Sequence, residues 1–200
     1  MDFYYGKGSV AFAALIALEE VGVNYQLHKV DMSQGEQTKP AYLAKNPKGR
    51  VPLLVTKEGP ISETPAILEY VASLAPELNL MPQGAYAAAK ERELLSYLAS
   101  TFHINHAMKL RGYRWSDDET VINNLKLKVT ENMSASAQFI EDHYLDGDYL
   151  LGAYSIADMH LFAISNWFEV DGVDITKFPK LAAWRARMEE REAVKRAFDK

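Results

Sequence analysis

Cysteine is absent from this sequence of 200 residues. The absence excludes a fold held together by disulfide bonds, a zinc site built on thiolates, and an enzyme that uses its own cysteine as nucleophile. The chain also has no need of an oxidising compartment. Any sulfur chemistry that this protein performs must therefore use the thiol of another molecule.

Long hydrophobic runs and an excess of positive charge are also missing. The longest apolar run covers residues 10–18, whereas a membrane-spanning helix needs about 20 residues. Asp2 precedes this run and Glu19 and Glu20 follow it, so it lacks the flanks of a secretory signal. With 27 acidic against 22 basic residues and a pI near 5.6, the chain lacks the basic surface of nucleic-acid binders, whose pI is usually above about 9. We therefore expect a cytoplasmic protein that binds neither membranes nor nucleic acids.

The first part of the chain alternates between strand and helix patterns. Apolar residues make up 48% of the sequence, which is enough to build a core and excludes a disordered chain. We expect strands at residues 2–5, 24–30, 51–55 and around Ile61, and a helix that begins at Ser9 and ends at Gly22. The turn at residues 57–60 is too short for a crossover, so the last two strands should form an antiparallel hairpin. A second helix should begin at Thr64, with Pro65 in its first turn.

The rest of the chain shows only helical periodicity. Residues 79–84, which include Pro82, have the composition of a linker. Helices are expected at 85–109, 117–144, 155–169, 179–191 and 192–198. We therefore predict an α/β domain at residues 1–78, a linker at 79–84 and an all-α domain at 85–200. This order of elements is typical of a thioredoxin-like domain followed by a helical bundle.

Three short motifs stand out in this framework: NPKGRVP at 46–52, ETPAI at 63–67 and SIAD at 155–158. On its own, Pro52 is a proline at the entry of a strand, where no ladder N–H is required. Thr64 has the features of an N-cap, and the helix N-terminus that it begins is suited to an anion. Ser155 and Asp158 form the pattern of a capping box, which we expect to be structural.

With this order and spacing, the motifs resemble those of the cytosolic glutathione S-transferases. The likeness continues in the FPKL motif at 178–181 and in Trp184, so it covers nearly the whole chain. Within the family, residues 1–18 and His103 are most similar to the bacterial beta class. The resemblance implies a glutathione transferase fold, glutathione as co-substrate, a small hydrophobic electrophile, a homodimer and no metal.

The resemblance also assigns residues that bind glutathione. It implies a cis peptide bond before Pro52, so that the main chain of Val51 pairs with the cysteinyl unit as an added strand would. Glu63 and Thr64 would bind the ammonium and carboxylate of the γ-glutamyl end. Further contacts are expected from two groups of side chains: those near the glycyl carboxylate, Gln37, Lys39 and Arg50, and one facing the site from the second domain, His103.

The residue that activates the thiol is left open by the sequence. Members of the beta class usually place a cysteine where this chain has Val10, and the hydroxyl that follows is replaced by Ala11. Ser9, as a hydroxyl at the N-cap of the first helix, and Tyr5, at the end of the first strand, are the candidate donors. The third possibility is that main-chain N–H groups of Ser9 or Val10 hold the sulfur.

The pocket for the electrophile should lie between the first helix and a face of the second domain that carries Met108, Tyr113 and Trp115. His103 and His106 share one helix face, but the sequence places no third ligand beside them, so no metal site is predicted.

Conjugation of glutathione to electrophiles is the first functional hypothesis. A glutathione-dependent peroxidase or disulfide oxidoreductase is the alternative within the enzymes. A non-catalytic regulatory or interaction protein is the third hypothesis: the missing cysteine favours it, whereas Pro52, Glu63 and Thr64 argue against it, because an interaction module has no need of a tripeptide site.

Overall fold

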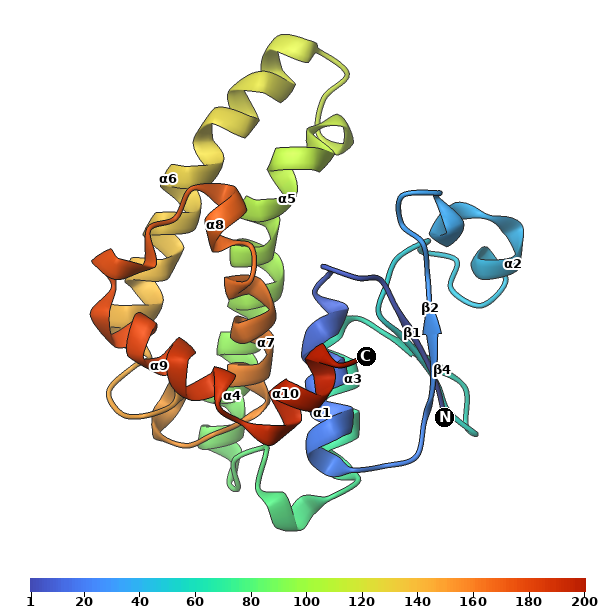
Figure 1. Ribbon diagram of the computed structural model, residues 1–200, viewed down its shortest axis with the longest axis vertical. Coiled ribbons are helices and arrows are strands. Elements are labelled where there is room, and N and C mark those ends of the chain that lie inside the picture. Colours follow the sequence, from blue (N-terminus) through green and yellow to red (C-terminus); the bar gives the residue numbers. More distant parts are fainter.

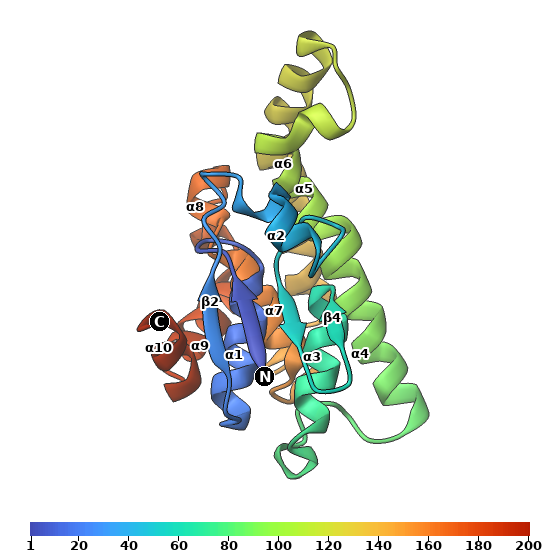
Figure 2. The ribbon, with the colours of Figure 1, turned by 90° about the vertical axis from the view of Figure 1, so that its right-hand side faces the viewer.

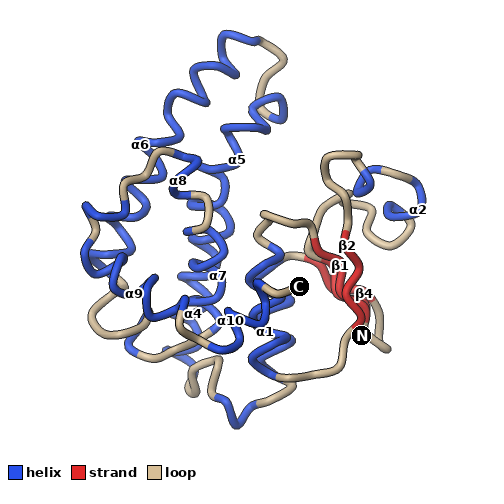
Figure 3. Tube along the Cα trace, viewed as in Figure 1, coloured by secondary structure: helices blue, strands red, loops and turns tan.

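The computed structural model describes residues 1–200 and contains a four-stranded sheet in the order β2-β1-β3-β4. Strand β1 (Asp2–Tyr5) pairs in parallel with β2 (Gln26–Lys29) and antiparallel with β3 (Leu53–Val55). Strand β4 (Pro60–Ser62) completes the antiparallel hairpin with β3, as predicted. The sheet lies at one side of the molecule, and the remainder consists of helices and the loops that connect them (Figure 3).

Helix α1 (Ala11–Val21) lies between the sheet and the helical part of the chain (Figure 1). It contacts α3 (Thr64–Ser73), α7 (Ile156–Ser165) and α10 (Glu192–Phe198) as well as β1. Its first eight residues are all apolar and all buried. A helix that is apolar on every side is expected to be covered on every side. The start of α1 therefore has a fixed position between the two halves of the molecule.

The segment between β2 and β3 contains a 3₁₀ turn at Glu36–Thr38 and the short helix α2 (Pro40–Leu43). This segment lies on the side of the sheet away from α1 (Figure 1). Tyr42 on α2 is buried and packs edge-on against Tyr4 of β1, which anchors the segment to the sheet.

The helical part begins with one long helical path and not with the single α-helix predicted for 85–109. Helix α4 (Ala85–Tyr97) continues through a π-helical turn at Leu98–Phe102 into α5 (His103–Arg111). A 3₁₀ turn at Gly112–Arg114 leads to α6 (Glu119–His143), which runs beside α5 (Figure 2). A π turn widens the helix locally and is often found at functional sites.

The remaining four helices complete this part, and the first of them is buried along its whole length. They are α7 (Ile156–Ser165), α8 (Phe168–Asp171), α9 (Pro179–Glu189) and α10 (Glu192–Phe198). The helix predicted at 155–169 is therefore divided, and Asn166 and Trp167 form the break. No helix is both long and apolar enough to cross a membrane.

The capping box at Ser155 and Asp158 forms as predicted, and it does more than cap α7. The Asp158 carboxylate accepts the Ser155 N–H at 2.9 Å. It also accepts the N–H of Leu150 at 3.0 Å and the indole N–H of Trp184 at 2.7 Å. One buried carboxylate therefore joins the start of α7 to the preceding loop and to α9.

Candidate functional site

A cleft of about 580 Å³ opens where the start of α1, the loop before β3, the start of α3 and the face of α5 meet. It is lined by most of the residues that the sequence indicates: Ser9, Gln37, Arg50, Val51, Pro52, Glu63, Thr64 and His103. Tyr5 and Lys39 do not line it. The structure thus brings together residues that are as far apart in sequence as 9 and 103.

The loop before β3 presents an unpaired stretch of main chain to the cleft. The Val51–Pro52 peptide bond is cis, as expected from the resemblance. The main-chain N–H and C=O of Val51 make no hydrogen bond within the protein. The neighbouring carbonyl of Arg50 accepts two hydrogen bonds, from the hydroxyl of Tyr42 and from the side-chain amide of Asn46, both at 2.7 Å. The loop is therefore fixed while Val51 is free to pair with an extended peptide.

Glu63 lies at the start of α3 in a conformation that few residues other than glycine adopt, with φ of 78°. Such backbone strain is found at binding sites where the surroundings enforce it. The Nζ of Lys48 lies 2.6 Å from the Glu63 carboxylate and 2.9 Å from the hydroxyl of Ser62. The carboxylate is thus oriented by the cation of Lys48, a residue of the NPKGRVP motif for which the sequence predicts no role.

The prediction that Thr64 is the N-cap of this helix is wrong. Glu63 occupies that position and Thr64 is the first helical residue. Because the positive φ of Glu63 shifts the helix start by one residue, the hydroxyl of Thr64 makes no capping bond. The main-chain N–H of Thr64 has no partner within the protein, so it is available to an anion.

Ser9 is also not the N-cap that the sequence predicted, because Val10 takes that position. The Ser9 hydroxyl donates to the carbonyl of Gly6 at 2.7 Å and accepts the N–H of Ala11 at 3.3 Å. The Ser9 N–H donates to the same Gly6 carbonyl at 3.1 Å. Both donors of Ser9 are therefore used inside the protein, whereas the N–H of Val10 has no partner.

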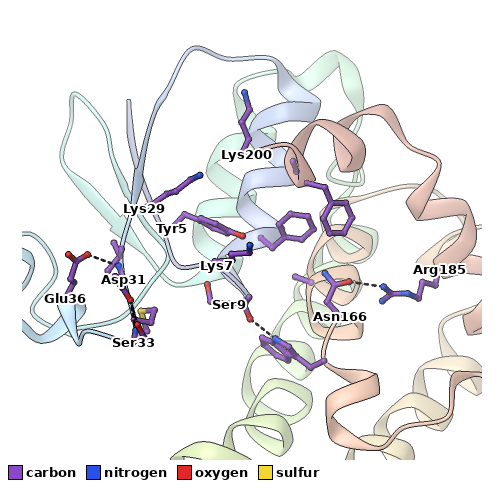
Figure 4. A pocket seen from close by; sticks show the side chains of 18 residues that line it. Tyr5, Lys7, Ser9, Lys29, Asp31, Ser33, Glu36, Asn166, Arg185 and Lys200 are labelled. Carbon is purple, nitrogen blue, oxygen red and sulfur yellow. Dashed lines mark hydrogen bonds between the residues drawn. The ribbon is translucent and has the colours of Figure 1, made fainter.

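Tyr5 lines a second cavity, of about 1040 Å³, on the other side of the Lys7–Ser9 turn. Figure 4 shows its hydroxyl directed toward Lys7, with Lys29 and Lys200 at the rim. Burial raises the pKa of Tyr5, and a backbone hydrogen bond at Gly8 offsets only part of that rise. Tyr5 therefore stays protonated at neutral pH. Across this cavity Asn166 accepts a hydrogen bond from Arg185 (Figure 4).

Positive charge gathers in the cleft from both halves of the chain. Arg50 comes from the loop before β3, Arg111 from the end of α5 and Arg114 from the turn that follows. None of the three forms an ion pair with a carboxylate. Burial lowers the pKa of the half-buried Arg111, and the nearby charges of Arg114 and Arg50 lower it further. Unpaired guanidinium groups favour the binding of an anion.

Two histidines at the cleft are neutral. Burial lowers the pKa of His103 to about 3, and the charge of Arg111 adds to this effect. His160, on α7, is fully buried, and neither of its ring nitrogens has a hydrogen-bond partner. Burial lowers its pKa to about 3 as well. Neither ring therefore supplies a positive charge to the site near pH 7.

Trp167 connects the cleft to the helical part of the chain. Its indole N–H donates to the carbonyl of Gly8 at 2.8 Å. The ring of His106 stacks on it, with centroids 3.9 Å apart and planes at 10°. The Nδ1 of His106 lies 2.6 Å from Oδ2 of Asp171. No local pattern in the sequence distinguishes Trp167 or Asp171 from ordinary helix residues, so neither is predicted as a site residue.

The candidate electrophile face agrees in part with the sequence. Tyr113 and Trp115 line the cleft together with Val10, as expected. Met108 does not line it and instead packs against the core. No group of three or more His, Cys, Asp or Glu is arranged to hold a metal ion.

Two family models match this chain. One describes the glutathione S-transferase N-terminal domain and matches residues 3–73, and the other describes the C-terminal domain and matches residues 86–192. Among curated proteins, glutathione S-transferase GstA of Escherichia coli O157:H7 is 28% identical and covers 98% of this chain and 96% of its own. Maleylacetoacetate isomerase of Pseudomonas aeruginosa is 30% identical over 90% of this chain and 86% of its own.

Solved structures show the same fold. A glutathione transferase homolog from Sulfitobacter, with bound glutathione, is 42% identical and superposes with a TM-score of 0.96 over 99% of this chain and 96% of that chain. The beta-class glutathione S-transferase of Sphingomonas chungbukensis is 28% identical, with a TM-score of 0.87 over 100% of this chain and 98% of that chain.

Proposed function

The chain belongs to the glutathione S-transferase family, and we propose that it conjugates the thiol of glutathione to small hydrophobic electrophiles. The observation that carries the proposal is the cleft itself, because it gathers a free main-chain edge, an oriented carboxylate and unpaired guanidinium groups. The main-chain edge suits the cysteinyl unit of glutathione, the carboxylate suits its ammonium group, and the guanidinium groups suit its carboxylates.

Glutathione fits the cleft from end to end. Its cysteinyl unit pairs with the free N–H and C=O of Val51, as an added strand does. Its γ-glutamyl ammonium binds the Glu63 carboxylate, and its γ-glutamyl carboxylate binds the N–H of Thr64 at the start of α3. Its glycyl carboxylate lies toward Arg50 and Gln37, which both line the cleft and whose side-chain N–H groups can donate to it. Lys39, which does not line the cleft, is left without a direct role.

The sulfur is held by main chain at the start of α1. The N–H of Val10 is the free donor there, since both donors of Ser9 bind Gly6. A helix N-terminus stabilises an anion, and a lowered thiol pKa follows from that stabilisation. Of the candidates in the sequence, the structure supports the main chain in preference to the hydroxyl of Ser9 or of Tyr5.

The electrophile binds next to the sulfur, between Val10 and the apolar face formed by Leu110, Tyr113 and Trp115. These large side chains are partly or well exposed, so a hydrophobic molecule gains free energy by covering them. The second cavity shares Ser9 and Trp167 with the cleft and offers room for bulkier substrates.

A two-fold homodimer is part of the proposal. Tyr86 on α4 is 80% exposed and Leu74, just after α3, is 40% exposed. Exposed apolar side chains on neighbouring elements are typical of an interface. The molar mass in solution, from light scattering, measures this directly.

The purified protein tests the proposed function. We expect retention on immobilised glutathione and measurable conjugation of 1-chloro-2,4-dinitrobenzene. Retention without conjugation, together with turnover of a peroxide or a mixed disulfide, would instead support the glutathione-dependent peroxidase or oxidoreductase. Absence of retention would contradict the proposed cleft and favour an interaction protein.

A further inference from the structure

Lys48 and Glu63 form an ion pair inside the cleft, where the γ-glutamyl end of glutathione is expected to bind. The Nζ of Lys48 lies 2.6 Å from Oε1 of Glu63 and 2.9 Å from the hydroxyl of Ser62. All three residues line the cleft. Lys48 comes from the loop before β3 and Glu63 from the start of α3, 15 positions further along the chain. The pair therefore places one positive and one negative charge side by side in the site.

This ion pair is exposed, and each partner depends on the other alone. The side chain of Lys48 is 50% exposed and that of Glu63 is 61% exposed. Neither charge has a second ion-pair partner within the protein. An ion pair in contact with water contributes little to stability, so the two side chains can exchange each other for the charges of a ligand. A ligand that takes only one of them leaves the other without a counter-charge.

The end group of a free α-amino acid matches this pair charge for charge, because it carries an ammonium and a carboxylate on one carbon atom. When such a group lies head to tail against the pair, its ammonium contacts Glu63 and its carboxylate contacts Lys48. The main-chain N–H of Thr64 has no partner within the protein and can donate to the same carboxylate, which accepts several hydrogen bonds. Both protein charges then keep an opposite charge in the complex.

We propose that Lys48 is a specificity-determining residue, which binds the α-carboxylate of the γ-glutamyl unit and makes the cleft selective for thiols that end in a free amino acid zwitterion. The inference rests on the proposed function and adds a residue to it. Glutathione exchanges one internal ion pair for two pairs with the ligand. An analogue without the α-carboxylate displaces Lys48 from Glu63 and gives the lysine no anion in return. An analogue without the ammonium draws Lys48 away and gives Glu63 no cation in return.

Two other roles of Lys48 would give different results, and in both of them its Nζ makes no contact with the ligand. If Lys48 only positions Glu63, its loss weakens the binding of every ligand that has the ammonium. If Lys48 only occupies the ammonium position in the free protein, its loss strengthens the binding of these same ligands. The response of ligands with and without the α-carboxylate therefore distinguishes the three roles.

Three ligands provide this comparison: S-hexylglutathione, its 4-aminobutyryl analogue, which lacks the α-carboxylate, and its glutaryl analogue, which lacks the ammonium. The hexyl chain should cover the apolar face at Tyr113 and Trp115, and it is the same in all three. Calorimetric titration gives the Kd of each ligand for the full chain and for Lys48→Met and Lys57→Met, in which an uncharged, unbranched side chain replaces the lysine. Lys57 is exposed in the turn between β3 and β4 and serves as the control.

We expect Lys48→Met to raise the Kd of S-hexylglutathione about 10-fold and that of the glutaryl analogue by a similar factor. The Kd of the 4-aminobutyryl analogue should stay within about 3-fold of the parental value or fall, because no lysine then competes for Glu63. The preference of the parent for the zwitterion over the 4-aminobutyryl analogue is thereby reduced. Lys57→Met should change none of the three Kd values.

Thermal unfolding shows whether each variant is folded. An unchanged or lower Kd of S-hexylglutathione in Lys48→Met, or a rise that is equally large for the 4-aminobutyryl analogue, would overturn the inference. Either result would leave the proposed function intact, because the parent still binds the glutathione derivative. A parent protein that binds no S-hexylglutathione would overturn the proposed function itself.

Discussion

The indole N–H of Trp167 donates to the carbonyl of Gly8 at 2.8 Å, across 159 positions of sequence. The bond fixes the turn before α1 against the segment between α7 and α8. It therefore transmits the packing of the helical part to the place where the sulfur is expected. The stacking of His106 on the same indole gives Trp167 a second contact in the site.

Trp167→Phe removes this hydrogen bond and keeps an aromatic ring for His106. We expect a loss of about 1 kcal/mol in the free energy of unfolding and a several-fold lower kcat for chloroaromatic conjugation, because the turn at Gly8 is no longer fixed. Glutathione affinity should change little, because Val51 and Glu63 are untouched. Urea unfolding and steady-state kinetics measure both effects, and an unchanged kcat would show that the bond serves stability alone.

The Ser9→Ala variant shows whether the hydroxyl of Ser9 has a catalytic role or only a structural one. The hydroxyl already donates to Gly6 and accepts from Ala11, so its loss should lower the free energy of unfolding by about 1 kcal/mol. We expect kcat for the chloroaromatic to stay within about 3-fold of the parent, since the Val10 N–H is retained. A fall of about 100-fold or more would restore Ser9 as the thiol-activating group.

Asp158→Ala should destabilise the protein far more than Ser155→Ala. Removal of the carboxylate leaves the N–H groups of Leu150, Ser155 and Trp184 without their acceptor, at about 1–3 kcal/mol for each buried donor. Loss of the Ser155 hydroxyl removes one cap, worth about 0.5–2 kcal/mol. Urea unfolding compares the two variants, and equal effects would contradict the role assigned to Asp158.

His160 should make the fold sensitive to acid. Burial lowers the pKa of His160 to about 3, whereas an unfolded histidine has a pKa of about 6.5. Between these values the unfolded chain binds a proton that the native state does not, so stability falls as pH decreases. From pH 7 to pH 5 the loss from this group is about 2 kcal/mol.

His160→Leu should remove that part of the acid sensitivity and be at least as stable at pH 7, because two buried nitrogens without partners disappear. His143→Gln, which changes an exposed histidine, should keep the parental pH dependence. Unfolding curves at pH 7 and pH 5 for the three proteins measure the difference. Parallel pH dependence in His160→Leu and the parent would contradict the prediction.

The sequence predicts the fold well wherever a local signal is strong. Alternation and turn composition predict all four strands, and Ser155 with Asp158 predicts the start of α7. The break at Trp167 and the π turn at Leu98–Phe102 were missed. Both depend on tertiary packing, because the residues on either side continue a helical pattern.

The site is predictable only as far as its motifs extend. Val51, Pro52 and Glu63 lie in short motifs whose spacing is visible in the chain. The positive φ of Glu63 displaced the predicted cap at Thr64, and no propensity indicates such a conformation for a glutamate. Asp171 was missed because its partner, His106, lies 65 positions away in the sequence.

Glutathione binding by Glu63→Gln tests the central claim most directly. Calorimetric titration compares the parent, this variant and Glu58→Gln, which changes an exposed carboxylate in the turn between β3 and β4. Glutamine preserves the size of the side chain but removes the charge that binds the γ-glutamyl ammonium. We predict a Kd raised by about 10-fold or more for Glu63→Gln and an unchanged Kd for Glu58→Gln. An equal Kd for the parent and Glu63→Gln would contradict the account, because glutathione would then bind elsewhere than in the cleft described.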